Sequence, residues 1–184
     1  MLTVSDLPGL TPEVLARAAR VTALVLDVDG VLSDGRIIYD EFGDELKCFD
    51  VQDGSRLILW HRAGLKSAII TARKAKLIKR RAKEMLIDFL AQHALQKLSA
   101  FERFLTRYRL TAEQVCAVGD DLMDLPILRR AGLAVAVPNA VDEIKAVSHY
   151  VTTRAGGKGA VREIVDLILK AKGLWDEAIR PYRV

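Results

Sequence analysis

Residues 24–35, LVLDVDGVLSDG, place two carboxylates at the end of an apolar run. Apolar residues 23–26 lead into Asp27, and Asp29 and Gly30 follow after one more apolar residue. The run predicts a buried strand. Two carboxylates so close to its end repel each other and are costly to remove from water. We therefore expect either that this turn is fully solvated or that a positive charge lies between the carboxylates.

Apolar runs rich in β-branched residues alternate with helical patterns along the chain. Strands are expected over residues 22–26, 66–70, 87–90, 115–118, 133–137 and 149–152, and helices over 54–63, 74–85, 99–108, 121–131, 141–146 and 160–171. Strands that are apolar throughout and separated by helices predict a parallel sheet covered on both faces. The expected fold is a doubly wound, Rossmann-like α/β fold, and 184 residues fit a single domain over residues 1–184.

Residues 35–50 interrupt this alternation. Two short strand-like pieces, 36–39 and 46–49, surround a turn rich in Asp and Gly, which predicts a β-hairpin after the first expected strand. The hairpin is too small to be a domain, so we expect a flap or a contact between subunits. Three aromatic residues are candidate contacts: Tyr39, Phe42 and Phe49.

The two ends of the chain carry their own signals. Within residues 1–20, Thr11 and Pro12 are typical of the N-cap and first turn of a helix. The same segment has no basic start followed by an apolar stretch, so no secretory signal is expected. Residues 174–184 follow the last expected helix and contain Pro181, which that helix does not tolerate. Disorder is one expectation for this C-terminal tail.

The net charge of +4 is concentrated in one segment. Residues 73–83, RKAKLIKRRAK, contain seven basic residues and no acid, with apolar residues at helical spacing. The pattern predicts a helix with a basic outer face, which is either simply solvated or a rim that attracts phosphate. Nucleic acid is not an expected partner, because no aromatic residues or nucleic-acid motif accompany the charge.

The composition is typical of a globular protein. Hydrophobic residues make up 51% and charged residues 28% of the sequence. No apolar run approaches the ~18 residues that span a bilayer, so no membrane partner is expected. Cys48 and Cys116 both fall in expected strands, where buried free thiols are the usual interpretation. Free thiols favour a cytoplasmic location.

Polar residues follow four of the expected strands, at the edge of an open parallel sheet where ligands bind. Each group alone has an ordinary explanation as a turn, a helix cap or a surface lysine. Together they form an ordered set: Asp27 and Asp29, then Thr71 with Arg73, then Lys97, then Gly119, Asp120, Asp121 and Asp124. This joint order favours a catalytic site.

The set is typical of phosphoryl transfer assisted by Mg²⁺, which prefers oxygen ligands. Asp27, Asp120 and the backbone carbonyl of Asp29 are the candidate ligands. Asp27 would attack phosphorus and form an aspartyl-phosphate, while Asp29 would protonate the leaving oxygen and later deprotonate water. Thr71 and Lys97 would bind the phosphoryl oxygens and offset their charge.

These groups resemble the four motifs of the haloacid dehalogenase-like hydrolase superfamily: Asp27-Val28-Asp29-Gly30, Thr71, Lys97, and Gly119-Asp120-Asp121 with Asp124. Between about residues 21 and 171, the stretches DVDGVLSDGRI, FDVQDG, IITARKAKLI, KLSAF, VGDDLMDLPIL and AGGKGAVREIVDLIL further resemble the 3-deoxy-D-manno-octulosonate 8-phosphate phosphatases. The resemblance implies hydrolysis of the 8-phosphate of the eight-carbon keto-sugar acid of lipopolysaccharide, with Mg²⁺ as cofactor. It also implies a fold without a cap domain and a homotetramer in which flaps, neighbouring chains and C-terminal tails complete each site.

The resemblance assigns a role to each matching residue. Asp27 is the nucleophile and Asp29 the general acid and base. The metal ligands are Asp27, Asp29 and Asp120, with Asp121 and Asp124 in support. Substrate binding falls to Asp50, Val51, Gln52, Asp53, Gly54, Arg73, Arg81 and Lys97. The two arginines among them are candidates to receive the carboxylate or phosphate of the sugar.

Four positions depart from the pattern of that family. Gln52 stands where Arg is common, Arg56 and Ile58 stand where Gly and a basic residue are found, and Ala72 replaces the glycine of an I-T-G-R turn. All lie where the rest of the substrate would be recognised, so either Arg56 replaces a missing cation or the preferred sugar acid differs. The alternatives are a phosphatase for a nine-carbon keto-acid phosphate or another small sugar phosphate, and a nucleic-acid phosphatase suggested by charge alone. A non-catalytic oligomerisation module of the same fold is a further alternative, against which the intact motifs argue.

Overall fold

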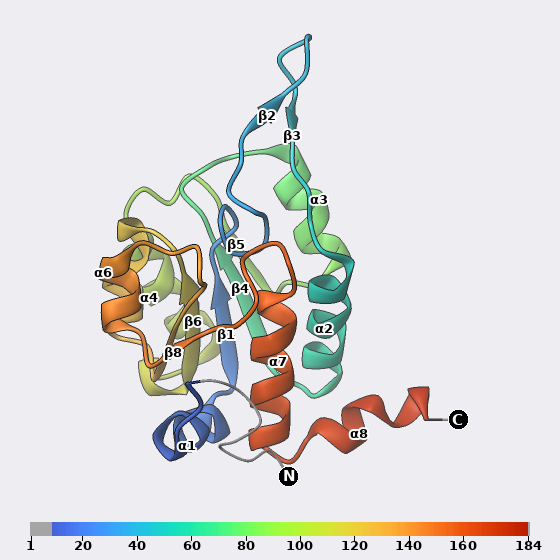
Figure 1. Cartoon of the computed structure of the whole chain (residues 1–184), viewed down its shortest axis with the longest axis vertical. Helices are drawn as coiled ribbons and strands as arrows, with labels where there is room; N and C mark the ends of the chain where they lie inside the picture. Colours follow the sequence, from blue (N-terminus) through green and yellow to red (C-terminus); the bar gives the residue numbers. More distant parts are fainter. Residues whose placement is uncertain (1–8, 184) are drawn as a thin grey trace.

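A computed structural model describes residues 9–183 of the chain (Figure 1). Its centre is a parallel sheet of six strands in the order β5-β4-β1-β6-β7-β8. The strands are β1 (Ala23–Leu26), β4 (Lys66–Ile70), β5 (Phe89–Ala91), β6 (Val115–Gly119), β7 (Leu133–Ala136) and β8 (Tyr150–Val151). The predicted parallel sheet is confirmed. The start of the predicted N-terminal segment, residues 1–8, and the last residue of the tail lie outside the described residues.

The strand order reverses at β1. This strand pairs with β4 on one side (Ala23 with Lys66) and with β6 on the other (Ala23 with Val115). The chain adds strands outward from β1 in both directions, so the sheet is doubly wound and the loop after β1 opens at the switch point where ligands bind. Every residue of β1 is buried. The buried apolar run therefore ends at Asp27.

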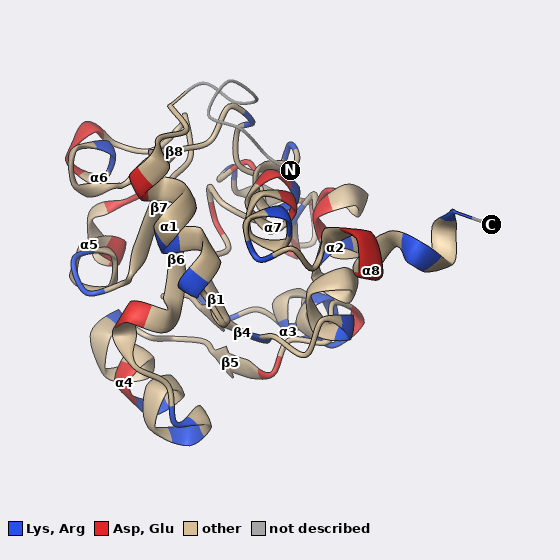
Figure 2. Ribbon diagram, turned by 90° about the horizontal axis from the view of Figure 1, so that it is seen from below, with Lys and Arg blue, Asp and Glu red and all other residues tan. Residues whose placement is uncertain are grey.

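Helices cover both faces of the sheet (Figure 2). One face carries α4 (Lys97–Tyr108), α5 (Leu125–Leu128) and α6 (Asp142–Val147), and the other carries α2 (Val51–Arg62), α3 (Lys76–Glu84) and α7 (Ala160–Ala171). α1 (Pro12–Arg20) packs on α7 and β7. The two apolar layers contain fully buried aromatic side chains from α2 (Trp60) and α4 (Phe101 and Phe104). Among residues 9–183, no helix is long and apolar enough to cross a membrane.

Local capping explains where two of the helices begin. Thr11 caps α1 and Pro12 lies in its first turn, as predicted. α2 begins at Val51, earlier than predicted, because the Asp50 carboxylate accepts a hydrogen bond from the N–H of Gln52 (2.6 Å).

The helix predicted over residues 121–131 is replaced by two shorter pieces. A 3₁₀ turn, Leu122–Asp124, precedes α5, Leu125–Leu128. Pro126 is the physical reason, because proline lacks an N–H and is tolerated only in the first turn of a helix. The α-helical segment therefore begins immediately before it.

The flap, residues 35–50, projects from the sheet as an antiparallel hairpin of β2 (Ile38–Tyr39) and β3 (Glu45–Leu46) (Figure 1). The predicted hairpin is confirmed, with shorter strands. Its large apolar side chains are exposed: Ile37, Ile38, Tyr39, Phe42 and Leu46. Phe49, at the base of the flap, is half-buried and packs against the core of its own domain.

The two cysteines differ in environment. Cys116 lies in β6 and is buried, as predicted. Cys48 lies beyond the end of β3 and is exposed, so its predicted burial in a strand is wrong. A two-stranded ribbon has no second layer to cover its side chains, and this leaves the thiol at the surface.

The C-terminal tail is helical. α8 (Trp175–Ile179) and a 3₁₀ turn (Arg180–Tyr182) follow a break at Gly173, whose φ is +69°. α8 packs against α2 of the same chain, and Arg62 of α2 donates a hydrogen bond to the hydroxyl of Tyr182 (3.0 Å). The expectation of a disordered tail is therefore wrong for residues 174–183.

Candidate active site

The loop after β1 begins at Asp27 and turns tightly. The N–H groups of residues 31–33 all donate to the carbonyl oxygen of Val28 (2.9–3.3 Å), so the backbone itself closes the turn. Gly30 has φ +83°, and a Cβ there would lie 1.8 Å from Asp120 Oδ2. Only glycine therefore lets the Asp120 carboxylate lie against the backbone of this loop.

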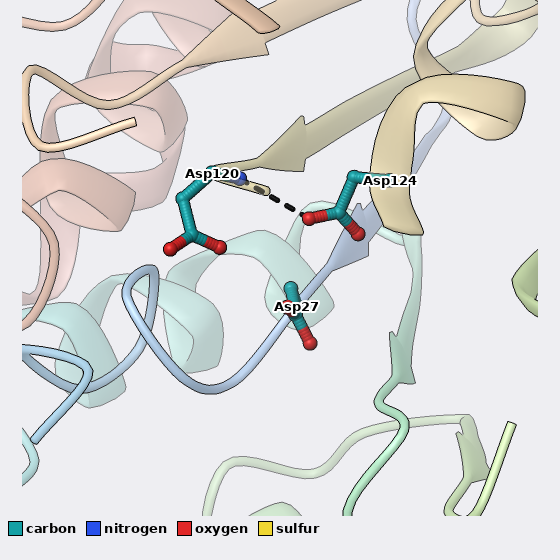
Figure 3. Close-up of side chains that lie close together, drawn as sticks. All are labelled: Asp27, Asp120 and Asp124. Atoms are coloured by element: carbon teal, nitrogen blue, oxygen red, sulfur yellow. Dashed lines mark hydrogen bonds between the residues drawn. The ribbon is translucent and has the colours of Figure 1, made fainter. Parts of the chain in front are cut away.

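Three carboxylates converge at the ends of β1 and β6 (Figure 3). Asp27, Asp120 and Asp124 each place one oxygen within 4.8 Å of the others, and we call these three residues the acidic cluster. Lys97, the buried first residue of α4, lies beside it. Its Nζ is 2.8 Å from Asp27 Oδ2 and 2.6 Å from Asp124 Oδ1. One lysine against three carboxylates leaves an excess of negative charge.

The acidic cluster is short of hydrogen-bond donors as well as of positive charge. Burial raises the pKa of Asp27 to about 7, with the charge of Asp124 adding to the rise and that of Lys97 opposing it. Burial also raises the pKa of Asp120 to about 7, and the charge of Asp27 adds to it. Asp27 Oδ1 and Asp120 Oδ1 are buried and accept no hydrogen bond from the described residues. A hard divalent cation requires such oxygen ligands, so the residues present fit Mg²⁺.

Asp124 has a larger part in the site than the predicted supporting role. Its Oδ2 accepts hydrogen bonds from the N–H groups of Asp120 (3.1 Å) and Asp121 (3.4 Å), while its Oδ1 accepts from Lys97. Asp121 is exposed and caps the 3₁₀ turn through the N–H of Leu122 (2.8 Å). Asp121 therefore has the ordinary role of a cap, whereas Asp124 holds the loop, the lysine and the cluster together.

The Asp29 carboxylate, predicted as the general acid and base, lies outside the acidic cluster. It pairs with Lys47 of the flap, and Arg73 Nε lies 3.8 Å from it. Glu45, also on the flap, is 2.7 Å from Lys47 and accepts a hydrogen bond from Arg73 (3.0 Å). The attraction of Lys47 holds the Asp29 carboxylate away from the acidic cluster. The backbone carbonyl of Asp29 stays the predicted metal ligand of this residue. Sequence reasoning missed Lys47 and Glu45, although alternate residues of a strand share a face.

Thr71 lies at the carboxyl end of β4, beside the loop after β1. Leu26 pairs with Ile69 across the two strands, so Thr71 and Asp27 leave the sheet at the same edge. The Thr71 side chain is buried, and its Oγ1 accepts a hydrogen bond from the N–H of Arg73 (3.3 Å). The hydroxyl can still donate its own hydrogen to a phosphoryl oxygen.

The chain matches the model of a family described as haloacid dehalogenase-like hydrolase over residues 58–164. It belongs to that family. It is also 44% identical to 3-deoxy-D-manno-octulosonate 8-phosphate phosphatase KdsC of Escherichia coli K12 over 169 residues, which cover 92% of this chain and 90% of that protein.

Solved structures of similar proteins carry ligands. The phosphatase of the same name from Moraxella catarrhalis, in complex with magnesium ion, phosphate ion and KDO, aligns with TM-score 0.90 and 41% identity over 93% of this chain and 98% of that one. The cobalt-bound deoxy-D-mannose-octulosonate 8-phosphate phosphatase of Haemophilus influenzae aligns with TM-score 0.83 and 33% identity over 86% of this chain and 93% of that one. In this haloacid dehalogenase-like hydrolase, the acidic cluster is therefore the candidate active site.

Several predicted substrate residues of this haloacid dehalogenase-like chain lie at the start of α2. Arg81 Nη2 donates to the backbone carbonyl of Asp50 (3.0 Å). The arginine crosses Gly54, where a Cβ would lie 2.4 Å from that nitrogen. Val51 is 80% exposed at the same corner. Arg81 Nε is buried without a hydrogen-bond partner among the described residues, so the structure brings these four residues together beside an unused donor.

Gln52 and Asp53 face α7. Asp53 is buried, its Oδ1 accepts a hydrogen bond from the N–H of Arg162 (2.7 Å), and burial raises its pKa to about 6. The structure thus uses Asp53 Oδ1 as a cap for α7, and the predicted substrate contact of Asp53 stays a prediction. Gln52 Oε1 accepts from Arg162 Nη1 (2.5 Å). In the family pattern, an arginine is common at the position of Gln52. Here the guanidinium of Arg162, from α7, is bound to Gln52 and so lies beside that position.

Arg56, one of the two alternatives for the missing cation, is paired within the described chain. Its Nε is 2.6 Å from Asp166 of α7, and its guanidinium lies 5.7 Å from the ring centroid of Trp175 on α8. The side chain ties α2 to α7 and α8, which argues against the alternative in which Arg56 replaces the missing cation.

Asn139, which sequence reasoning missed, fastens the loop after β1. Its Nδ2 donates to the carbonyl of Gly30 (2.8 Å), and its Oδ1 accepts from the N–H of Gly156 (2.8 Å). A Cβ at Gly156 would lie 1.7 Å from the Gly30 oxygen. The glycines of the stretch at 155–159 were the available signal, because closely spaced glycines indicate a close approach of two backbones.

Proposed function

We propose that this chain is a Mg²⁺-dependent phosphatase that hydrolyses the 8-phosphate of 3-deoxy-D-manno-octulosonate 8-phosphate. The observation that carries the reaction class is the acidic cluster, in which one lysine pairs with two of the three carboxylates and two carboxylate oxygens have no donor among the described residues. The substrate is supported by the 44% identity to the Escherichia coli phosphatase and by the similarity to a structure that holds magnesium, phosphate and KDO.

Asp27 and Asp120 would hold the Mg²⁺ ion, because their buried Oδ1 atoms accept no hydrogen bond from the described residues. The backbone carbonyl of Asp29 is a further candidate ligand. When bound, the ion supplies the positive charge that offsets the carboxylates and polarises the phosphoryl group. Asp124 keeps this arrangement in place through Lys97 and the backbone N–H of Asp120.

Asp27 is the nucleophile of the proposed reaction. Its carboxylate attacks phosphorus, the bond from phosphorus to the sugar oxygen breaks, and an aspartyl-phosphate forms. Lys97, 2.8 Å from Asp27 Oδ2, and Thr71 hold the phosphoryl oxygens. Asp29 gives a proton to the leaving sugar oxygen and later takes one from the water that releases phosphate.

A panel of sugar phosphates tests the substrate. We expect turnover that requires Mg²⁺, with the highest kcat/KM for 3-deoxy-D-manno-octulosonate 8-phosphate. A higher kcat/KM for a nine-carbon keto-acid phosphate or another small sugar phosphate would move the assignment to that alternative and leave the phosphatase mechanism in place. The absence of turnover with every phosphomonoester would favour the non-catalytic oligomerisation module.

We also propose that the chain forms a homotetramer through its flap. Tyr39 is 61% exposed and Phe42 is 84% exposed, on a two-stranded ribbon that is marginal by itself in water. Packing against other flaps would cover these side chains. Sedimentation should show a tetramer at micromolar concentration, and the double variant Tyr39→Ser/Phe42→Ser should dissociate it. A wild-type monomer at that concentration would contradict the proposal.

We infer, further, a cytoplasmic enzyme of lipopolysaccharide biosynthesis. Cys48 and Cys116 are free thiols, as is usual in proteins of reducing compartments. The proposed product is the keto-sugar acid of lipopolysaccharide. Cell fractionation that finds the activity outside the cytoplasm would contradict the location.

A further inference from the structure

Lys47 has a fully buried side chain, although it lies on a largely exposed flap. Its Nζ pairs with Asp29 Oδ1 on the loop after β1 and lies 2.7 Å from Glu45 Oε1 on β3. A buried ammonium group is costly unless carboxylates surround it, and here two do. The flap is thereby joined to the loop that carries the proposed general acid and base.

Arg73 completes a ring of alternating charge. Its Nη2 donates to Glu45 Oε2 (3.0 Å), and its Nε lies 3.8 Å from Asp29 Oδ2. The ring joins three separate segments, namely the loop after β1, the flap and the loop after β4. Because each side chain is held by a neighbour of opposite charge, the place of the Asp29 carboxylate depends on residues outside the acidic cluster.

Lys47 is the member of this ring that donates a hydrogen bond to Asp29 in the described part of the chain. Arg73, at 3.8 Å, is too distant for one. We propose that Lys47 is a positioning residue of the phosphatase, which holds the Asp29 carboxylate where it transfers protons to the leaving oxygen and from water. This inference rests on the proposed function, because it takes Asp29 as the general acid and base.

A positioning role predicts a dependence on the leaving group. A sugar alkoxide must be protonated as it leaves, whereas p-nitrophenolate leaves readily without a proton. Lys47→Met should lower kcat/KM for the sugar phosphate by ~10- to 100-fold, and for p-nitrophenyl phosphate by less than about threefold. The ratio kcat/KM is the readout because it covers only the steps up to the aspartyl-phosphate. Lys47→Arg keeps the charge and should recover most of the loss.

A double-mutant cycle tests whether Lys47 acts through Asp29. If it does, Lys47→Met combined with Asp29→Asn is no slower than Asp29→Asn alone. Lys66→Met is the matched control, because it removes the lysine of another lysine–aspartate pair, Lys66–Asp88 (2.9 Å), at the opposite edge of the sheet. Its kinetics should equal those of the wild type. If Lys47→Met fails to fold, Glu45→Gln should show the same leaving-group dependence at smaller size.

Three results would overturn the inference. Equal losses on both substrates would mean that Lys47 binds the phosphoryl group itself, full additivity in the cycle would mean that it acts apart from Asp29, and wild-type rates for Lys47→Met would mean that it only anchors the flap. Wild-type rates for Asp29→Asn would instead overturn the proposed acid and base, so the two failures are distinguishable.

Discussion

Polar clusters lie at both edges of the sheet, and they differ in how their charges are partnered. At the carboxyl edge, three carboxylates lie beside one lysine, which pairs with two of them. At the amino edge, Asp88 accepts hydrogen bonds from Lys66 Nζ (2.9 Å) and from the N–H of Ser67 (2.9 Å), and it lies 3.5 Å from His61. His61 Nε2 in turn lies 3.1 Å from the Ser67 hydroxyl. The charged groups of the amino-edge cluster have partners among the described residues. The carboxyl-edge cluster has carboxylate oxygens that accept no hydrogen bond from them.

The difference separates stability from function. Buried polar groups are normally paired, and the hydrogen bonds of the amino-edge cluster hold α2, β4 and the start of β5 together. It contains a serine, a histidine and an aspartate in contact, yet Ser67 has no exposed surface, so a substrate cannot reach its hydroxyl. The carboxyl-edge cluster lacks partners that a metal ion and a phosphate would supply. Unsatisfied charge, more than residue type, marks the candidate active site.

The largest expected effect is on activity at the carboxyl edge. Asp27→Asn removes the proposed nucleophile and should lower kcat by more than about 10⁴-fold. It also removes one of three mutually repelling carboxylates, so the melting temperature should not fall. Steady-state kinetics and thermal unfolding of the metal-free protein check both parts. A variant that keeps activity would end the mechanism, and a variant that loses its fold would contradict the contrast between the two edges.

The reverse pattern is expected at the amino edge. Asp88→Ala leaves the buried N–H of Ser67 without its acceptor and Lys66 without its partner, which should lower the free energy of unfolding by about 1–3 kcal/mol. The ratio kcat/KM should stay unchanged, because the whole sheet separates this cluster from the substrate. Denaturant unfolding and kinetics on the same preparation measure the two quantities. A tenfold loss of kcat/KM in folded protein would show that the edges are coupled.

In metal-free protein, the contributions of the two edges to folding stability should change with pH in opposite directions. The pKa values of Asp27 and Asp120 are raised by burial from 3.8 to about 7. The folded state therefore keeps protons that the unfolded chain releases, and stability falls as pH rises from about 4 to 7. Burial lowers the pKa of His61 from its ordinary value of 6.5. The unfolded chain therefore binds a proton more readily at His61, and stability falls as pH drops below about 6.5.

Melting curves across this range separate the two contributions. Asp27→Asn should flatten the loss of stability toward neutral pH, and His61→Gln should flatten the loss toward acid pH. Addition of Mg²⁺ should restore wild-type stability near neutral pH, because ligands that bind only the folded state stabilise it. A pH profile that neither variant changes would contradict the assignment of these slopes.

The smallest expected effect concerns a paired charge in the N-terminal half of α2. Arg56 is paired with Asp166 and lies over Trp175, so Arg56→Met should cost about 0.5–1.5 kcal/mol of stability and leave KM within about twofold. Chemical denaturation and KM for the sugar phosphate provide the test. A rise in KM of tenfold or more would place Arg56 in the substrate site after all.

Strand order alone makes part of the site predictable from the sequence. Asp27, Thr71 and Asp120 each directly follow a strand, and parallel strands of an open sheet end at one edge. Their meeting is a consequence of topology. Lys97 is predictable for the same reason, since it begins the helix that follows β5.

Pairs that are distant in the chain could not be predicted in the same way. Lys47 and Asp29 are 18 residues apart, and Gln52 and Arg162 are 110 apart, with no periodicity that connects them. The same holds for Arg56, whose partner lies on α7. Charge pairing between elements depends on how the elements pack, and packing is decided by the whole core. The predictions about charged side chains of the site failed where such a side chain had a choice of partners.

The most direct test of the central claim is to locate the phosphoryl group during turnover. Rapid acid quench of enzyme mixed with Mg²⁺ and saturating 3-deoxy-D-manno-octulosonate 8-phosphate, followed by mass spectrometry of peptides, should find the added phosphoryl group on Asp27, formed at least as fast as kcat. The same group on another residue, or unchanged turnover in Asp27→Asn, would contradict the account.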